Sequence, residues 1–311
     1  MNLNRIILVF AVSLITASTA LAQSSMQDIN IPALVRETNR NGVQMSSRMF
    51  DYTFTQTVSL RLINKNGRVK TEPLRVYEVY PMPGRRLIKK LVSEDGMMIS
   101  QERAAKELKR VSDALTKAER EEEQKKAKQT SQASVVTLQS ETQCEIAGYA
   151  TEFFGADGGE IIFSIPDFLC AGEFYAPRRE SFRGRDTIVL SFRPRASYVP
   201  PSKARAPIAK LIGTVWIDAS DKIVSRLEAW TAAQQSVAQS SPRQSFHTEA
   251  ALIYEQVRLA DGTWLHASTR MNTASNPSLF NGVNIDFKDT FDDFHRFNAE
   301  SKSFQLASPK P

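Results

Sequence analysis

The chain has 311 residues, of which 41% are hydrophobic and 24% charged, with a formal net charge of +6 and a pI near 9.3. This composition is that of an ordinary globular protein, with room for one large domain or two smaller ones. Basic residues are dispersed among acidic ones, so the charge indicates a solvated surface and argues against nucleic acid as a partner.

The N-terminus predicts a signal peptide of residues 1–22. Arg5 provides the positive charge, residues 6–15 form an apolar stretch, and Ala20-Leu21-Ala22 matches the A-x-A cleavage pattern. The apolar stretch is too short to span a bilayer comfortably, and no later stretch is long enough. We therefore expect a soluble periplasmic chain that starts at Gln23 and carries no lipid anchor, because no cysteine follows the cleavage site.

A helix followed by long strands is expected next. Residues 27–48 place apolar side chains at helical spacing. From Tyr52 to Leu62 the period changes to two, which predicts a half-buried strand. Asn66-Gly67 is a strong hairpin signal, and strands are expected at 71–80 and 86–92.

Residues 100–130 predict a charged helical insertion. Ser100 is a suitable N-cap, and apolar residues recur at three-and-four spacing from Ala104 to Ala118. From Glu119 to Lys128 almost every residue is charged. We expect the first half to pack on the body and the second half to run into solvent.

The second half of the chain reads as one hairpin after another. Successive hairpins imply antiparallel neighbours, because parallel pairs need long crossovers. The predicted class is mainly β (α+β), with one large antiparallel sheet in a single domain of residues 23–311. The expected strand pairs are 173–182 with 187–193, 210–217 with 222–231, and 250–259 with 263–271, and a closing strand is expected at 291–304.

No catalytic motif is found. His247, His266 and His295 are the three histidines, and none has the spacing of a metal site. There is no nucleophile elbow, P-loop or dinucleotide-binding glycine motif. The sequence thus predicts a protein that is not an enzyme and has no cofactor.

An acidic cluster and two cysteines are further candidate sites. Asp286, Asp289 and Asp292-Asp293 could bind Ca²⁺ but lack the EF-hand loop pattern, so we interpret them as acids on the wet face of strands, with no metal. Cys144 and Cys170 could form a disulfide in an oxidising compartment or remain buried thiols, and the spacing leaves both open.

The apolar face of the sheet leaves two alternatives open. Seventeen Phe and three Trp could fill a packed core, the usual arrangement, or line a ligand cavity. Phe54 and Trp216 are the candidate ligand-binding residues. Each could face the cavity or the opposite side, because one register slip reverses a strand.

Several segments resemble a known family. Gly213-Thr214-Val215-Trp216-Ile217-Asp218, followed by Asp221-Lys222 and residues 224–228, resembles the central hairpin of outer-membrane lipoprotein-sorting proteins, which are related to the periplasmic lipoprotein carriers of the Lol pathway. Residues 291–297 and the prolines before Lys210 resemble exported relatives.

This resemblance implies an unclosed β-barrel with helices covering the open side and a cavity that holds acyl chains. The implied function is a periplasmic non-enzymatic carrier of lipids or lipoproteins, with acyl chains and envelope proteins as partners. The alternative is a structural or protein-interaction module of the cell envelope. The chain departs from the family in its greater length and its charged helix, and no position matches the family's cavity arginine.

Overall fold

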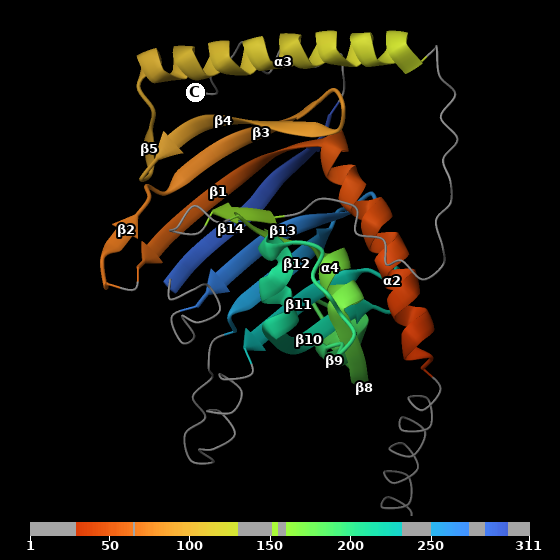
Figure 1. Ribbon diagram of the computed structural model, residues 1–311. Coiled ribbons are helices and arrows are strands. Elements are labelled where there is room, and N and C mark those ends of the chain that lie inside the picture. Colours follow the sequence, from red (N-terminus) through yellow and green to blue (C-terminus); the bar gives the residue numbers. More distant parts are fainter. Residues whose placement is uncertain are drawn as a thin grey trace, which may run out of the picture.

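The computed structural model describes residues 29–64, 66–129, 151–154, 160–231, 250–273 and 284–297 (Figure 1). Its helices are α2 (Ile31–Ser46), α3 (Gln101–Gln129) and α4 (Ile165–Ala171), with 3-10 helices η1 (Ser47–Asp51) and η2 (Lys203–Lys210). Within these residues, no helix has a stretch long and apolar enough to cross a membrane. The strands are β1 (Tyr52–Ile63), β2 (Val69–Thr71), β3 (Arg75–Met82), β4 (Arg86–Glu94), β5 (Met97–Met98), β6 (Thr151–Phe154), β7 (Glu160–Phe163), β8 (Gly172–Phe182), β9 (Arg185–Pro194), β10 (Leu211–Asp218), β11 (Val224–Thr231), β12 (Leu252–Arg258), β13 (Trp264–Asn272) and β14 (Asn284–Arg296).

Twelve strands form one antiparallel sheet in the order β5-β4-β3-β1-β14-β13-β12-β11-β10-β9-β8, with β2 paired to β1 off this path. The edges β5 and β8 do not pair with each other, so the sheet stays open. Strands β6 and β7 form a separate hairpin. The expected large, unclosed antiparallel sheet with few helices is confirmed.

The first long strand, β1, pairs with β14, the last strand among the described residues. Leu60 of β1 pairs with Phe287 of β14, and Leu62 pairs with Ile285. The alternation predicted from Tyr52 is confirmed: Phe54 and Leu62 are buried on one face, whereas Arg61 is exposed on the other. We call the face that carries Phe54 and Leu62 the inner face, and the opposite one the outer face.

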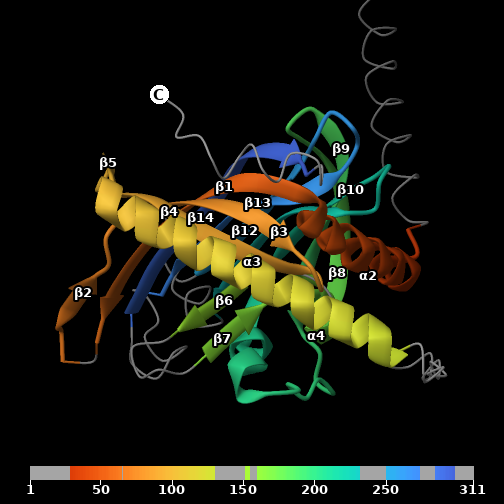
Figure 2. The ribbon, with the colours of Figure 1, turned by 90° about the horizontal axis from the view of Figure 1, so that it is seen from above.

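The main core lies between the inner face and α2 and α4. Leu34 of α2 and Phe168 of α4 pack against inner-face residues such as Leu190 and Val215, which are fully buried. All seven residues of α4 are buried. The β6–β7 hairpin lies over the same face as α4 (Figures 1 and 2), and β7 contacts η2.

Helix α2 is fixed at its start and near its end. The side-chain carbonyl of Asn30 accepts a hydrogen bond from the backbone N–H of Ala33 (3.0 Å), and Pro32 suits the first turn. The Asn41 side chain donates to the backbone carbonyl of Asp221 (3.1 Å), in the turn between β10 and β11. The helix is thereby attached to one end of the sheet.

Helix α3 does not cover the inner face, so it is not one of the helices that the resemblance places over the open side of the sheet. It packs Val111 against Tyr80 of β3 and Ile88 of β4. Tyr80 directly follows Val79, which pairs with Phe54 on the inner face, and successive side chains of a strand point to opposite faces. Helix α3 therefore lies on the outer face, beside the edge of the sheet (Figure 2).

The same helix protects the exposed edge of β4. A carboxylate oxygen of Glu107 accepts a hydrogen bond from the backbone N–H of Leu91 (3.2 Å), and Arg110 donates to the backbone carbonyl of Lys89. These bonds take the place of those to a neighbouring strand. An edge with unpaired backbone groups would otherwise promote aggregation. Packing continues beyond Ala118, because Glu121 forms an ion pair with Arg86 (3.1 Å), so the helix leaves the body about one turn later than we expected.

Two residues of the β10–β11 hairpin, Gly213 and Asp218, are required by its geometry. A Cβ atom on Gly213 would lie 2.0 Å from the carbonyl oxygen of Glu228 and 2.7 Å from the ring of Phe192, so only glycine fits. At the other end, the buried carboxylate of Asp218 accepts hydrogen bonds from Arg185 (2.5 and 3.0 Å) and from two backbone N–H groups of its turn. Burial alone would raise the pKa of Asp218, but these bonds outweigh it and lower the pKa.

Candidate functional site

Phe54 lies on the inner face and is only 4% exposed. It belongs to a second apolar cluster with Met49, Tyr52, Val79, Leu265 and Phe291, which we call the Phe54 cluster. Its ring centroid is 5.6 Å from those of Phe291 and Phe294. Phe54 thus lies in a packed part of the inner face, and its role as a ligand-binding residue stays a prediction.

Trp216 lies on the outer face. Its neighbours Val215 and Ile217 are fully buried in the main core, so the strand pleat directs Trp216 away from it. Its indole N–H donates to Glu180 (3.0 Å), and the Arg226 guanidinium lies 5.8 Å from its ring centroid. The structure therefore does not bring Phe54 and Trp216 together on one face.

A buried carboxylate interrupts the apolar inner face. Asp289 of β14 is 2% exposed, and both of its carboxylate oxygens lie 2.8 Å from the side-chain nitrogen of Gln56, which donates to them. Burial raises the pKa of Asp289 to about 7, although the hydrogen bond from Gln56 and the charge of Lys89 act in the opposite direction. The side-chain oxygen of Gln56 is buried and has no hydrogen-bond partner.

Our assignment of Asp289 to a wet face was wrong. The alternation Ile285, Phe287, Asp289, Phe291 puts this carboxylate on the same face as three buried apolar residues. That period-two pattern was present in the sequence and could have identified it. Asp292 points to the opposite face and is exposed.

His266 is also buried near this polar pair. It is 3% exposed, and its ring stacks on Tyr254 with the centroids 4.5 Å apart. Its Nε2 shares a hydrogen bond with the hydroxyl of Thr269 (2.8 Å), and burial lowers the pKa of His266 to about 3. A neutral histidine and a threonine that are both sealed from solvent form a structural contact and offer no accessible nucleophile.

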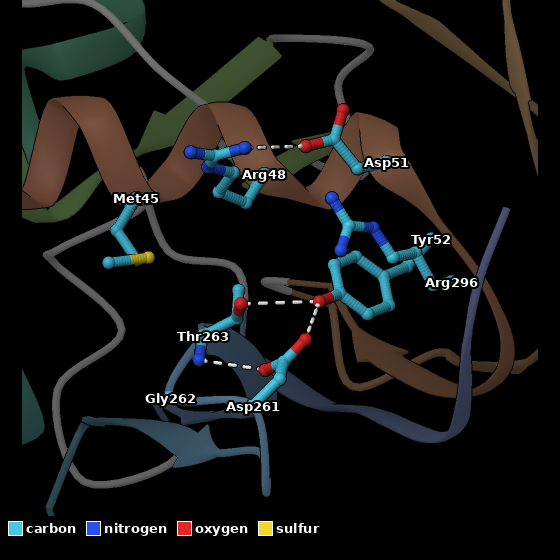
Figure 3. A pocket seen from close by; sticks show the side chains of 8 residues that line it. All are labelled: Met45, Arg48, Asp51, Tyr52, Asp261, Gly262, Thr263 and Arg296. Atoms are coloured by element: carbon cyan, nitrogen blue, oxygen red, sulfur yellow. Dashed lines mark hydrogen bonds and ion pairs between the residues drawn. The ribbon is translucent and has the colours of Figure 1, made fainter.

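A polar pocket of about 320 Å³ opens where β1, β14 and the β12–β13 turn meet the end of α2 (Figure 3). Its floor is the hydroxyl of Tyr52, which donates to Asp261 (2.6 Å) and is 3.2 Å from the hydroxyl of Thr263. The other carboxylate oxygen of Asp261 accepts from the backbone N–H of Thr263 (2.9 Å). Met45, Arg48, Asp51, Gly262 and Arg296 complete the lining.

The pocket has two arginines and two aspartates, but only one of the arginines forms an ion pair within it. Arg48 donates to Asp51 (3.2 Å), whereas the guanidinium of Arg296 forms no hydrogen bond or ion pair within the part of the chain that the structure describes. The hydrogen bond from Tyr52 is the main cause that lowers the pKa of Asp261, and the charge of Arg296 contributes to it. Burial raises the pKa of Tyr52, as do the hydrogen bond to Asp261 and its negative charge.

The remaining sequence candidates are dispersed. His295 is exposed and lies 2.9 Å from Asp293, as expected of a surface residue, and His247 lies outside the described residues. Over the described ranges, no group of three or more histidine, cysteine or acidic side chains could hold a metal ion. Cys170 is buried in α4, but Cys144 lies outside the described residues, so their disulfide stays a prediction.

No protein-family model matches the sequence, and no curated protein matches it significantly. Three solved structures are similar to most of this chain, each over 86% of it and each with a TM-score of 0.30. One is described as an outer membrane lipoprotein-sorting protein domain from Vibrio parahaemolyticus (11% identity, 99% of that chain), and another is a LolA superfamily protein from Nitrosomonas europaea (11%, 97%). A DUF1329 family protein from Desulfovibrio piger is similar at 9% identity over 96% of its chain. At this identity and TM-score, none of the three carries an argument about ligand or activity.

Proposed function

We propose that this protein is a periplasmic, non-enzymatic carrier that holds the acyl chains of lipids or lipoproteins against the inner face of its sheet. The observation behind the proposal is one row of cross-strand neighbours that contains no polar side chain. This row crosses eight strands, from β1 to β8, through Leu60, Phe287, Met271, Leu252, Ala229, Gly213, Phe192 and Phe174.

The length of this row suits an acyl chain. Neighbouring strands lie about 4.8 Å apart, so seven steps between strands extend about 34 Å. The acyl region of one bilayer leaflet is about 15 Å thick. Each buried methylene contributes about 0.8 kcal/mol before the costs of binding, so the apolar carbons of a sixteen-carbon chain gain about 12 kcal/mol without any catalytic group.

The cover of the inner face is built of separate pieces. α2, α4 and the β6–β7 hairpin lie over it, and α2 contacts α4. The β6–β7 hairpin is a sheet of its own, and the helices join the core through side-chain packing, so moving these pieces leaves the strand pairing of the large sheet intact. In the structure, α2 and α4 fill the space that an acyl chain would occupy, so the proposed binding requires that this cover move.

A displacement assay with a fluorescent fatty acid tests this function. We expect saturable micromolar binding and competition by unlabelled palmitate. Replacing Leu60 with glutamine puts an amide on the apolar row, which costs about 1–3 kcal/mol and weakens binding by about 5-fold to 150-fold. Leu74→Gln is the matched control, because Leu74 is 41% exposed between β2 and β3. A wild-type protein that binds no acyl ligand would disprove the carrier function.

The alternative function is a protein-interaction module of the envelope. Met97 and Met98 favour it, because they are 72% and 77% exposed on β5, an edge strand of the sheet. An edge strand can take up a strand of a partner protein. If the acyl-binding assay fails, this edge is the next surface to examine.

A further inference from the structure

The acceptors of the polar pocket in Figure 3 are occupied, whereas some of its donors are unused. Asp261 accepts hydrogen bonds on both carboxylate oxygens, from Tyr52 and from the backbone of Thr263. Asp51 accepts from Arg48. A guanidinium has five N–H donors and accepts no hydrogen bond, so the unused hydrogen-bond donors of this pocket belong to its arginines.

Arg296 holds most of this unused capacity. It stands at the end of β14, directly opposite Tyr52 of β1 in the sheet register. It lines the pocket, and its guanidinium makes no hydrogen bond or ion pair to another described residue. Guanidinium groups form bidentate hydrogen bonds with carboxylate and phosphate oxygens, and these charge-assisted bonds are stronger than hydrogen bonds between neutral groups. The chemistry that fits the unused donors is therefore an oxyanion.

The pocket also adjoins the apolar inner face. Tyr52 provides its hydroxyl to the pocket, while its ring belongs to the Phe54 cluster. Phe54 and Phe291 of that cluster lie on β1 and β14, which carry the apolar row farther along, at Leu60 and Phe287 and beyond the Gln56–Asp289 pair. A molecule with its charged group at Arg296 would thus have its apolar part directed toward the inner face.

We propose that the pocket between Arg48 and Arg296 binds the oxyanion head of an amphiphile, a carboxylate or a phosphate, whose acyl chain lies on the inner face. This inference rests on the proposed carrier function and adds the chemical class of the ligand's head. It predicts that this protein distinguishes acyl ligands by charge.

Palmitate and hexadecanol test the inference, because they share an acyl chain and differ in the head. Both are measured by displacement of a fluorescent fatty acid, and inorganic phosphate is titrated separately by calorimetry. The variant is Arg296→Gln, and the control is Arg61→Gln, on the exposed outer face of β1. Both arginines are exposed, so thermal melting of each variant should match that of the wild type.

We expect Arg296→Gln to weaken palmitate binding about tenfold, the usual effect of losing a charge-assisted hydrogen bond, and to leave hexadecanol binding unchanged. Arg61→Gln should change neither. Equal binding of palmitate by wild type and Arg296→Gln would overturn the oxyanion site while leaving the carrier function intact. If neither amphiphile binds but phosphate does, and Arg296→Gln weakens it, the carrier function fails and the oxyanion site stands. Absence of all three would refute both.

Discussion

Replacing Asp289 with asparagine tests whether the buried carboxylate of the inner face is a neutral acid. Asparagine has nearly the same shape, carries no charge and can still pair with Gln56, whose side-chain oxygen lacks a partner. A protonated Asp289 could also donate to that oxygen, so the acid and the amide should be interchangeable at low pH. At high pH, the wild type must bury a negative charge and the variant need not.

The size of the effect follows from the pKa of Asp289, which burial raises from 3.8 to about 7. The folded state holds this proton more tightly than the unfolded state, so the contribution to stability is complete below pH 3.8 and is lost as the pH rises to about 7. The two values differ by about three pH units at about 1.4 kcal/mol each, which sets an upper limit of about 4 kcal/mol. His266 acts in the opposite direction, because its pKa falls from 6.5 to about 3 and its contribution is lost as the pH falls.

The two opposing slopes make the difference between variant and wild type the quantity to measure. Urea denaturation followed by tryptophan fluorescence at pH 4, 6 and 8 provides it, since the contribution of His266 is common to both proteins. We expect Asp289→Asn to equal the wild type at pH 4 and to be more stable at pH 8, by at most about 4 kcal/mol. Asp286→Asn, on the exposed outer face of the same strand, should change stability by less than about 0.5 kcal/mol. A difference that does not vary with pH, or a variant less stable at pH 8, would refute the argument.

Three further predictions concern a glycine, the two cysteines and the signal peptide. Gly213→Ala should destabilise the protein by about 1–3 kcal/mol, because the added methyl group has no room between two strands, and an unchanged urea midpoint would contradict this. Cys144 and Cys170 should show no free thiol when the exported protein is denatured without reductant, and their loop of about 25 residues would then contribute about 3 kcal/mol. Two titratable thiols would exclude that disulfide. The intact mass of the exported protein should correspond to cleavage between Ala22 and Gln23, and retention of residues 1–22 would disprove the signal peptide.

The sequence by itself determined the local structure and the fold class. Strand β1 follows from the period-two alternation from Tyr52 to Leu62, and α3 follows from the spacing between Ala104 and Ala118, because these periods are properties of neighbouring residues. Repeated hairpins with short turns permitted only antiparallel pairing, and so predicted the large sheet. The same pattern held the information that Asp289 is buried, although the three acidic residues near it suggested a wet surface.

The tertiary structure decided what lies on which face and what meets across long distances in the chain. The side of the sheet to which Trp216 points depends on register, and a shift of one residue reverses it. The position of α3 depends on contacts of Glu107 and Arg110 with the edge of β4, and no local pattern encodes a partner on another element. The polar pocket joins Arg48 to Arg296 through the pairing of the first long strand with the last, and such pairings come from the packing of the whole sheet.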